Sequence, residues 1–396
     1  MPGVLIAFDK WKSCFTAAQA CEVSARALNG VGADWTCDLC PLSDGGEGFG
    51  KTLTERVGGE WRLEQVSGPV GGPVTSGFGL VRCDRLPSAV KDLLTGPFRE
   101  SDRLGVVEMA SASGLELVEA ARRDPWRTGT GGTGELLVRA AEAGAAAIVL
   151  GIGGSATNDL GLGALGHLGV EALDQPGREV FPLTPGRWEE VAGFRGNVPP
   201  DFPPIFIACD VTNPLLGPHG CAAVYGPQKG LRPEDVPRMD AGAARMARML
   251  CDYCRQPLSL CDAPGSGAAG GMAFGLCAAA SARCVSGGDL FAAWMDLDRR
   301  LAECDVVLTG EGAFDATSLM GKGPGDIVRR ASASGKRVVV LAGSVDPELR
   351  LPAGVIARAV TPAGLPLSEA IASGPRLLAQ AVAEAFAAYP AGAKDP

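Results

Sequence analysis

Histidine is nearly absent from this chain, which has only two, His167 and His219, among its 396 residues. Proton transfer in any reaction would therefore fall to carboxylates or lysines. The sequence also lacks a G-x-S-x-G motif, the nucleophile turn of the α/β-hydrolases. These two absences disfavour a hydrolase built on a Ser-His-Asp triad.

Runs of lysine and arginine are also absent, and the formal net charge is -9. An acidic chain without a basic patch is not typical of a nucleic-acid-binding protein. The nearest candidate for a membrane span, residues 265–282, is too rich in glycine and alanine, and a packed helix is expected there instead. No signal-peptide pattern follows Met1. We therefore expect a cytoplasmic protein that binds neither nucleic acid nor membranes.

The 13 cysteines form an odd number and are spread unevenly along the chain. This distribution is typical of reduced, buried thiols rather than of a disulfide framework. Cys251 and Cys254 would share one face of a helix, and Cys261 follows them. No fourth ligand has the spacing of a structural zinc site, so a metal site at these cysteines is not favoured.

Strand and helix patterns alternate along most of the chain, which predicts an α/β fold with a doubly wound, mostly parallel sheet. Residues 61–80 instead predict a hairpin with Gly/Pro turns. Helices are expected over residues 157–168 and 289–302, among others. We expect two domains that face a cleft: a discontinuous Rossmann-like α/β domain from residues 1–60 and 284–396, and an inserted α/β domain from residues 61–283.

The most informative segment is AAIVLGIGGSATNDLGLG, residues 146–163. A strand-like run ends at closely spaced glycines, and a helix is expected to open near Ser155. Glycine allows close backbone approach to a ligand, and the first turn of a helix presents N–H groups to an anion. We expect hydrogen bonds to an anion from Gly153, Gly154, Ser155 and Thr157. Asn158 and Asp159 in the same turn favour Mg²⁺ or a polar substrate alongside, rather than a plain pyrophosphate cradle.

Six predicted strand ends carry Asp, Ser or Lys beside glycine. In open α/β sheets, ligands bind beyond the carboxyl ends of the strands. Phosphoryl transfer requires backbone donors, lysines for the phosphates, carboxylates for Mg²⁺ and one carboxylate on the substrate hydroxyl. The chain has no Walker motif, so the site would not be a P-loop. The candidate residues are Asp9, Lys10, Lys12, Asp44, Asp210, Glu311, Asp315, Ser318 and Lys322.

A dinucleotide-binding turn is the alternative interpretation of the glycine-rich segment. Gly151, Gly153 and Ala156 form G-x-G-x-x-A after a strand, and Glu171 follows at the spacing of a ribose-binding acid. This pattern would indicate an NAD-binding oxidoreductase. Asn158 and Asp159 would then face the pyrophosphate, which argues against it. NAD would also not explain the acids and lysines at the other strand ends.

Eight motifs, in order, resemble the ATP-dependent glycerate kinases of the bacterial and plant type. They are DKWKSCFTA, PLSDGGEG, VVEMASASGL, TGTGGTGELL, GIGGSATNDLG, ACDVTNPLLGPHGCAAVYGPQKG, GSGAAGGMAFGL and LTGEGAFDATSLMGKGP. The resemblance implies phosphorylation of D-glycerate by ATP with Mg²⁺, commonly at the 2-hydroxyl to give 2-phosphoglycerate. It also implies a two-domain α/β fold with the site in the interdomain cleft.

Two motifs depart from the family pattern. DSFKGSLSA is usual where this chain has DKWKSCFTA, so that Lys10, Trp11, Ser13 and Cys14 differ. GEGRIDSQTLHGK is usual in the late motif, so that Ala313 stands where arginine is common. Arginine is the natural bidentate partner of an anion. Lys10 would compensate for its loss only if the loop of the first motif faces the loop of the late motif that carries Ala313. A different hydroxy acid, or a catalytically weakened binder, is the alternative.

The resemblance and the chemistry of the side chains lead to hypotheses about individual roles. Asp315 is the first candidate to orient or deprotonate the attacking hydroxyl, and Asp210 is the second. Asp44 and Asp210 would bind Mg²⁺, which prefers carboxylate oxygens. Lys12 and Lys322 would neutralise the substrate carboxylate or the transferred phosphoryl group. Lys229 is either a solvated loop residue or a ligand contact. The remaining predicted substrate- or phosphate-binding residues are Asp9, Lys10, Gly153, Gly154, Ser155, Thr157, Asn158, Glu311 and Ser318.

Overall fold

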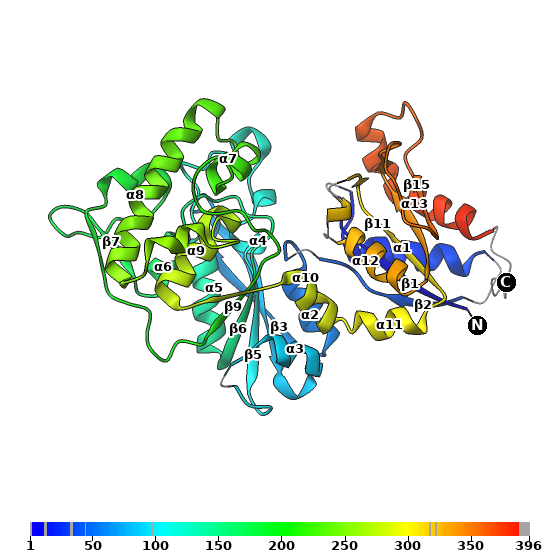
Figure 1. The fold of residues 1–396 in the computed structure, drawn as a ribbon, viewed down its shortest axis with the longest axis horizontal. Helices are drawn as coiled ribbons and strands as arrows, with labels where there is room; N and C mark the ends of the chain where they lie inside the picture. The colour runs from blue at the N-terminus through cyan, green and yellow to red at the C-terminus, as the bar shows by residue number, and fades with distance from the viewer. Residues whose placement is uncertain are drawn as a thin grey trace. The chain divides into compact units, whose positions relative to one another are not determined.

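The computed structural model of the protein describes residues 2–11, 14–31, 35–43, 45–96, 98–316, 318–320 and 323–387. The chain forms two compact units. The first unit comprises Met1–Asp44 and Phe291–Pro396, and the second comprises Gly45–Leu290 (Figure 1). Both ends of the chain therefore belong to one unit, and the middle of the chain forms the other.

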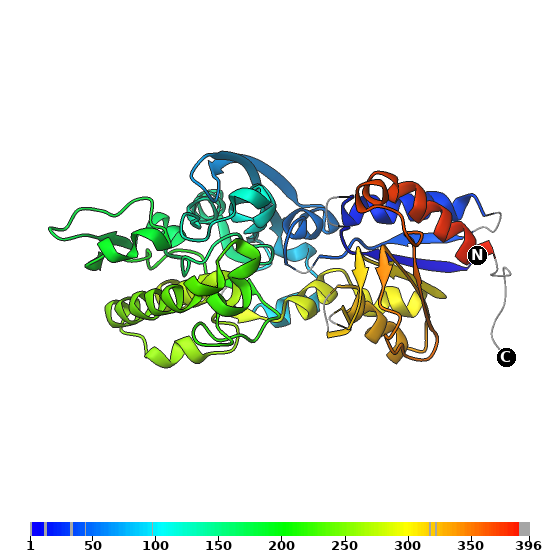
Figure 2. The same cartoon turned by 90° about the horizontal axis from the view of Figure 1, so that it is seen from above.

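The first unit is built on a five-stranded parallel sheet with strand order β15–β13–β11–β1–β2. Its strands are mostly apolar, which is typical of a parallel sheet that is buried on both faces. Helices α1 (Ala17–Asn29) and α13 (Leu367–Ala387) lie on one face and α12 (Pro324–Ala333) on the other (Figure 2). The strand bounds are β1 Gly3–Phe8, β2 Thr36–Leu39, β11 Val306–Gly310, β13 Arg337–Ala342 and β15 Val355–Ala359.

The register of this sheet follows from the period of two along each strand. Ile6 pairs with Leu308, and Leu308 pairs with Val339, so that the three side chains form one row across the sheet. All three belong to the hydrophobic core that α1 and α13 complete with Leu28, Leu378 and Phe386. The same register places the carboxyl ends of β1, β11 and β13 side by side at one edge.

The second unit contains a six-stranded sheet with order β10–β9–β6–β5–β4–β3. The first four strands in this order are parallel, and the hairpin β3–β4 adds to the edge in the antiparallel sense. The predicted hairpin and the predicted mostly parallel α/β fold are confirmed. The strand bounds are β3 Glu60–Ser67, β4 Pro73–Arg82, β5 Arg103–Glu108, β6 Ala145–Gly151, β9 Ile205–Ala208 and β10 Arg283–Val285.

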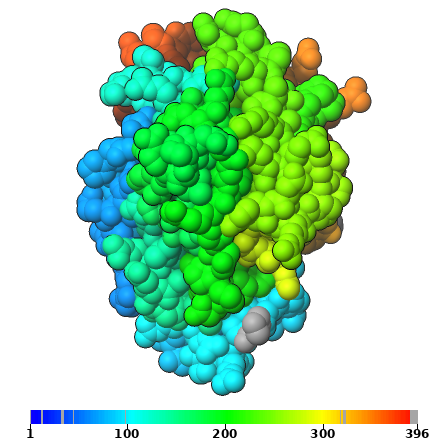
Figure 3. Space-filling view, turned by 90° about the vertical axis from the view of Figure 1, so that its left-hand side faces the viewer, coloured from blue at the N-terminus to red at the C-terminus, as the bar shows by residue number. Residues whose placement is uncertain are grey.

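Helices α5 (Gly131–Glu142), α6 (Leu162–His167), α8 (Val236–Cys254) and α9 (Ala268–Ala280) contribute to the core of this unit. The proline-containing excursion of residues 172–204 packs on α8, and the two lie on the face shown in Figure 3. Arg245 on α8 donates from Nη1 to the carbonyl of Trp188, at 2.8 Å, and Trp188 is buried. An irregular segment thus becomes part of the core through several buried side chains, among them Trp188, Val180 and Leu183.

The junctions between the units fall at residues 44/45 and 290/291, whereas the sequence placed them at 60/61 and 283/284. Helix α2 (Phe49–Arg56) accounts for the first difference. Its Phe49 and Leu53 are fully buried, and the helix contacts β4 and β5 of the second unit. The segment before the hairpin is therefore held by the sheet that the hairpin joins.

Three predicted helices begin late, divide or are interrupted at residues whose backbone is left-handed. The helix expected over 157–168 begins only at Leu162, because Leu160 and Gly161 have positive φ. The helix expected over 289–302 is divided at Asp296 into α10 (Gly287–Trp294) and α11 (Leu297–Glu303). Helix α9 is interrupted by left-handed Ala269, Gly270 and Gly271. A right-handed helix cannot continue through such residues.

All 13 cysteines are free thiols. Within the described part of the chain, no helix has the length and hydropathy needed to cross a membrane.

Arg300 links α11 to the edge strand of the first unit. Its side chain is only 4% exposed, whereas that of Asp38 is half exposed. Nε and Nη2 of Arg300 donate to the two carboxylate oxygens of Asp38 at 2.7 and 2.6 Å, and Nη2 also donates to the carbonyl of Leu39. This planar, two-point pairing is the strong form of an ion pair.

We predict that Asp38→Ala lowers the free energy of unfolding by about 1–3 kcal/mol, because it leaves a buried guanidinium without its charged partner. Urea unfolding followed by circular dichroism measures the change. Glu303→Ala is the matched control, since Glu303 pairs with Arg299 on the exposed face of α11 and should change stability by less than about 0.5 kcal/mol. Equal effects of the two substitutions would contradict the structural role of Arg300.

Candidate active site

The glycine-rich loop of residues 151–161 follows β6 at the carboxyl edge of the second sheet. Segments from distant parts of the sequence contact its backbone. Gly153 N donates to Gly45 O at 2.9 Å, Ala156 N donates to Ser113 O at 2.9 Å, and Leu160 N donates to Gly270 O at 3.0 Å. Thr128 Oγ1 donates to the carbonyl of Ala156 at 3.0 Å. Four of the other motifs, PLSDGGEG, VVEMASASGL, TGTGGTGELL and GSGAAGGMAFGL, therefore meet around this loop.

The glycines of the loop allow this close packing of backbone on backbone. A Cβ atom on Gly151 or Gly153 would come within 2.7 Å of Gly45 O or Gly46 N. Gly154 has φ near 70° and faces the carboxylate of Glu47, which would lie 2.7 Å from an added Cβ. The N–H of Gly153 is already satisfied by Gly45 O. The glycine spacing thus reflects contact with residues 45–47 of the same chain.

This packing removes the basis of the dinucleotide interpretation. In a dinucleotide-binding turn the glycines open toward the pyrophosphate, and a helix begins directly after them. Here Gly151 and Gly153 pack against residues 45 and 46, and helix α6 begins only at Leu162. Glu171, the expected ribose-binding acid, lies on β7 (Glu171–Leu173) and forms an ion pair with Arg195.

Asp159 is fully buried and accepts four hydrogen bonds. Oδ2 accepts from Thr130 N and Thr130 Oγ1 at 2.8 Å each and from Gly163 N at 3.2 Å, and Oδ1 accepts from Gly161 N at 3.2 Å. Burial raises the pKa of Asp159, and the four hydrogen bonds oppose that rise. Asp159 therefore holds the start of α6 against α5.

Lys229 is 2% exposed, so the solvated-loop interpretation of this residue is wrong. Its Nζ donates to Ser155 Oγ at 2.9 Å and to the carbonyl of Thr157 at 2.6 Å. Burial lowers the pKa of Lys229 to about 8, and the nearby Asp159 opposes this shift. The lysine thus anchors the middle of the 151–161 loop from a segment about 70 residues further along the chain.

Two predicted ligand-binding residues beside this anchor have unpaired polar atoms. Thr157 and Asn158 are 0% and 1% exposed. Within the described residues, no group forms a hydrogen bond with Thr157 Oγ1 or with either polar atom of the Asn158 amide. Such buried, unpaired groups cost stability and are rare in folded proteins. These unpaired atoms indicate that Thr157 and Asn158 are not optimised for stability.

Asp210 follows β9 at the same edge of the second sheet and is exposed. Its Oδ1 accepts from Ser286 Oγ at 3.3 Å and from Gly288 N at 3.0 Å, which caps the first turn of α10. Within the described residues, no three His, Cys, Asp or Glu side chains are arranged to hold a metal ion. Mg²⁺ in kinases is commonly held by one or two carboxylates with substrate phosphates and water, so a single exposed carboxylate fits that ion.

In the first unit, Asp9, Lys10 and Glu311 follow the neighbouring strands β1 and β11. Asp9 Oδ1 accepts from Lys10 N at 2.7 Å, and its Oδ2 lies close to Gly323 at the start of α12. The structure therefore brings these three positions to one edge of this sheet. They belong to the compact unit that does not contain the 151–161 loop.

Asp315 and Ser318, also in the first unit, close a short turn. Asp315 Oδ1 accepts from Ser318 N at 3.3 Å, and Asp315 N donates to Ser318 Oγ at 3.2 Å. This reciprocal pairing caps the one-turn helix η8 (Ser318–Met320) and gives Asp315 a structural role. Three other predicted site residues, Lys12, Asp44 and Lys322, lie outside the described residues.

The model of the glycerate kinase family matches residues 4–389. The chain belongs to the glycerate kinase family. A glycerate kinase of Halalkalibacterium halodurans is 34% identical over 388 residues, which cover 96% of each chain. A glycerate 2-kinase of Escherichia coli K12 is 32% identical over 350 residues, covering 87% of this chain and 86% of the relative.

A crystal structure of a Salmonella typhimurium LT2 chain named as a glycerate kinase 2 superposes with a TM-score of 0.75. It is 32% identical and covers 98% of this chain and 97% of its own. The family resemblance and the two-domain α/β fold expected from the motifs are therefore confirmed. The protein is an enzyme of the kinase class, a phosphotransferase with an alcohol group as acceptor.

Sequence reasoning missed the part played by Glu108. This residue ends β5, is 5% exposed and accepts from Gly50 N at 2.7 Å and from Gly48 N at 3.3 Å. It thereby holds the N-terminus of α2, where a carboxylate interacts favourably with the helix dipole. Its place in the motif VVEMASASGL, at a strand end, was the signal that could have identified it.

We predict that the wild-type protein gains stability relative to Lys229→Met as the pH rises from about 8 to 10.5. In this window the unfolded chain keeps a proton on Lys229 that the folded chain releases, so the free energy of unfolding rises with pH. The difference between the two proteins should change by up to about 3 kcal/mol. Urea unfolding at a series of pH values measures it.

Lys51→Met serves as the control, because Lys51 lies on α2 with an exposed side chain. Its stability should follow that of the wild type throughout the series. A stability difference between wild type and Lys229→Met that does not vary with pH would contradict the burial of a titrating ammonium group.

Proposed function

We propose that the protein transfers a phosphoryl group from ATP, supplied with Mg²⁺, to the 2-hydroxyl of D-glycerate and gives 2-phosphoglycerate. The observation that carries the proposal is family membership over nearly the whole chain. The name of the E. coli relative, glycerate 2-kinase, supports the position of transfer. The arrangement of acids at the strand ends of both sheets supports phosphoryl transfer in particular.

Asp315 and Asp210 are our candidates for the carboxylate that orients or deprotonates the attacking hydroxyl. Both also cap a turn, so a capping role alone has to be separated from a chemical one. Asp44 and Asp210 are the proposed Mg²⁺ ligands, and the ion would neutralise charge on the phosphates. Lys12 and Lys322 are proposed to bind the substrate carboxylate or the transferred phosphoryl group.

In the second unit, Thr157 and Asn158 are proposed to bind substrate or phosphate, supported by their buried and unpaired polar atoms. Ser155 is already engaged with Lys229, and the N–H of Gly153 with Gly45 O. We therefore assign Gly153 and Ser155 a positioning role and keep Gly154 as a candidate hydrogen-bond donor to a ligand.

Four residues of the first unit stay proposed ligand contacts: Asp9, Lys10, Glu311 and Ser318. That all these residues share one cleft stays a prediction.

Another hydroxy acid is the second candidate substrate, because of one specific residue. Ala313 begins the short strand β12 (Ala313–Phe314) and is exposed. The family commonly has an arginine at this position. Its side chain would project from the surface and offer an anion two parallel hydrogen bonds. Its absence here changes the charge available to a substrate carboxylate. We also propose a cytoplasmic location, which the 13 free cysteines support.

Incubation of the protein with Mg-ATP and a panel of small hydroxy acids tests the proposed reaction. We expect D-glycerate to be consumed fastest, with 2-phosphoglycerate identified by NMR of the product. Phosphorylation of the 3-hydroxyl, or faster turnover of another acid, would replace the proposed product or substrate. No phosphorylated acid in the whole panel would refute the proposed function.

We predict that an Asp→Asn substitution at the catalytic carboxylate lowers kcat by about 10²–10⁴-fold and leaves the fold intact. Asn at position 315 or 210 keeps the oxygen that caps the turn and removes only the charge and the basicity. Steady-state kinetics of Asp315→Asn and Asp210→Asn, each with a thermal unfolding curve, make the measurement. Asp252→Asn, at an exposed position of α8, is the control. Near-normal kcat in both variants would exclude both assignments.

A further inference from the structure

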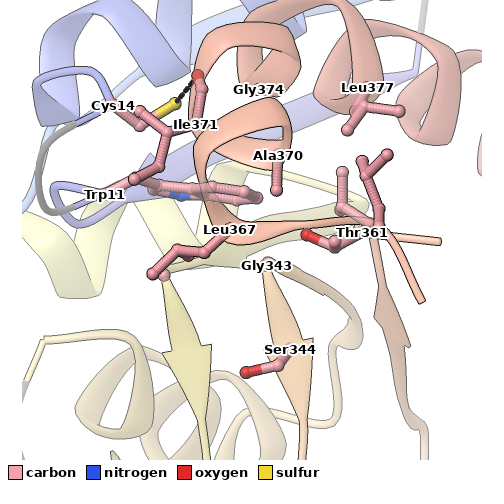
Figure 4. A pocket seen from close by; sticks show the side chains of 13 residues that line it. Trp11, Cys14, Gly343, Ser344, Thr361, Leu367, Ala370, Ile371, Gly374 and Leu377 are labelled. Atoms are coloured by element: carbon pink, nitrogen blue, oxygen red, sulfur yellow. Dashed lines mark hydrogen bonds between the residues drawn. The ribbon is translucent and has the colours of Figure 1, made fainter. Parts of the chain in front are cut away.

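A pocket of about 250 Å³ opens at the carboxyl edge of the sheet of the first unit (Figure 4). Its walls come from the loops that follow β1, β11, β13 and β15 and from the first turns of α13. The lining residues include Trp11, Gly312, Gly343, Thr361, Ala370 and Ile371. None of these positions was among the candidate residues predicted from the sequence.

The pocket lies where a doubly wound sheet binds its ligands. From β1 the chain proceeds to β2 on one side, and later to β11, β13 and β15 on the other side. Strand order therefore reverses between β1 and β11. Ligands of such sheets bind beyond the carboxyl ends of the strands at this point. Trp11 and Gly312 follow the two strands on either side of the reversal.

The lining of the pocket is uncharged. Within the described residues, no Asp, Glu, Lys, Arg or His side chain contributes to its walls. Such a surface cannot neutralise the carboxylate of a hydroxy acid or a phosphate group, because burying an unpaired charge is costly. The chemistry of the walls selects a neutral and largely apolar group.

Trp11 gives the pocket a flat aromatic wall. Its ring stacks on Phe15 with a centroid distance of 4.9 Å and an interplanar angle of 28°. Trp11 is 6% exposed, and no described residue forms a hydrogen bond with its buried Nε1. The indole lies close to Gly343, where an added Cβ would be 3.6 Å from Cζ3. Thr361 adds a hydroxyl group on the opposite side of the space (Figure 4).

The helical wall is attached to the loop after β1 by an unusual pair. Pro375 lies inside α13 and has no N–H, so the carbonyl of Ile371 lacks its usual partner four residues later. Cys14 Sγ donates to this carbonyl at 3.1 Å instead (Figure 4). The absence of a side chain on Gly374 leaves room for the thiol. The two walls that carry Trp11 and Ala370 are thereby joined.

We propose that this pocket binds the purine ring of the nucleoside triphosphate donor. The inference deepens the proposed function and rests on a nucleotide being the donor. Pockets that enclose a whole drug-sized ligand measure roughly 300–1,000 Å³, so this pocket takes a part of a nucleotide rather than all of it. A purine is flat and neutral, which suits an uncharged pocket that has an indole in its wall and a hydroxyl group from Thr361. Lys10 immediately precedes Trp11, so the charged phosphates would lie toward the loop that carries it.

Ala370→Leu, which enlarges a side chain in the wall that α13 contributes to the pocket, tests the proposal on the full-length protein. Leucine and alanine are both good helix formers, and Ala370 is half-buried on the pocket side. Ala372→Leu, two residues along the same helix and exposed, is the matched control. Equilibrium dialysis with radiolabelled adenosine measures base binding directly, because adenosine has no phosphate. ATP and inorganic triphosphate are measured in parallel.

We expect wild type and Ala372→Leu to bind adenosine, and Ala370→Leu to lose affinity for adenosine and ATP by about tenfold or more. Affinity for inorganic triphosphate should be the same in all three proteins. Ala370→Met, a more flexible filler, should give an intermediate loss and provides a second test if Ala370→Leu lowers the melting temperature.

Equal adenosine binding by Ala370→Leu and wild type would overturn the assignment of the pocket. Binding of inorganic triphosphate as tight as that of ATP in the wild type would overturn base recognition as a whole. The proposed function fails separately, through absence of a phosphorylated acid in the product assay. Adenosine binding is read without any turnover, so the two failures are distinguishable.

Discussion

The buried ammonium group of Lys229 is the interaction on which the second unit's candidate site depends. It holds Ser155 and the carbonyl of Thr157, and it lies near the fully buried Asp159. A charge in the protein interior is tolerated only when it is paired and hydrogen-bonded. The 151–161 loop is therefore fixed by groups that are costly to bury, which is typical of a site selected for geometry more than for stability.

The glycines of this loop show how one pattern can have two physical causes. Close backbone approach can serve a phosphate or another segment of the same protein, and glycine is required in both cases. Here Gly151 and Gly153 face residues 45 and 46, so the glycine-rich segment forms the base on which neighbouring side chains are presented. The unpaired atoms of Thr157 and Asn158 are the part of the loop left for a ligand.

The two units differ in the chemistry that their sheet edges offer. The edge of the first unit combines acids and Lys10 with an uncharged pocket beside Trp11, whereas the second presents Asp210 and the buried loop. A phosphoryl transfer between a nucleotide and a small acid needs both an apolar place for a base and polar groups for anions. The Cys14–Ile371 hydrogen bond matters in this context because it joins two walls of the apolar place.

The sequence by itself determined the α/β class, the hairpin and the family, because these depend on local periodicity and on motifs that can be read in order. It could not locate the helix breaks at Leu160, Ala269 and Asp296, since left-handed backbone at a non-glycine residue arises from packing. Nor could it tell that Lys229 is buried, that Glu108 caps α2, or that Gly153 packs on Gly45. Only the tertiary structure decided these points, because burial and hydrogen bonding depend on residues that are 58 to 108 positions apart in the chain.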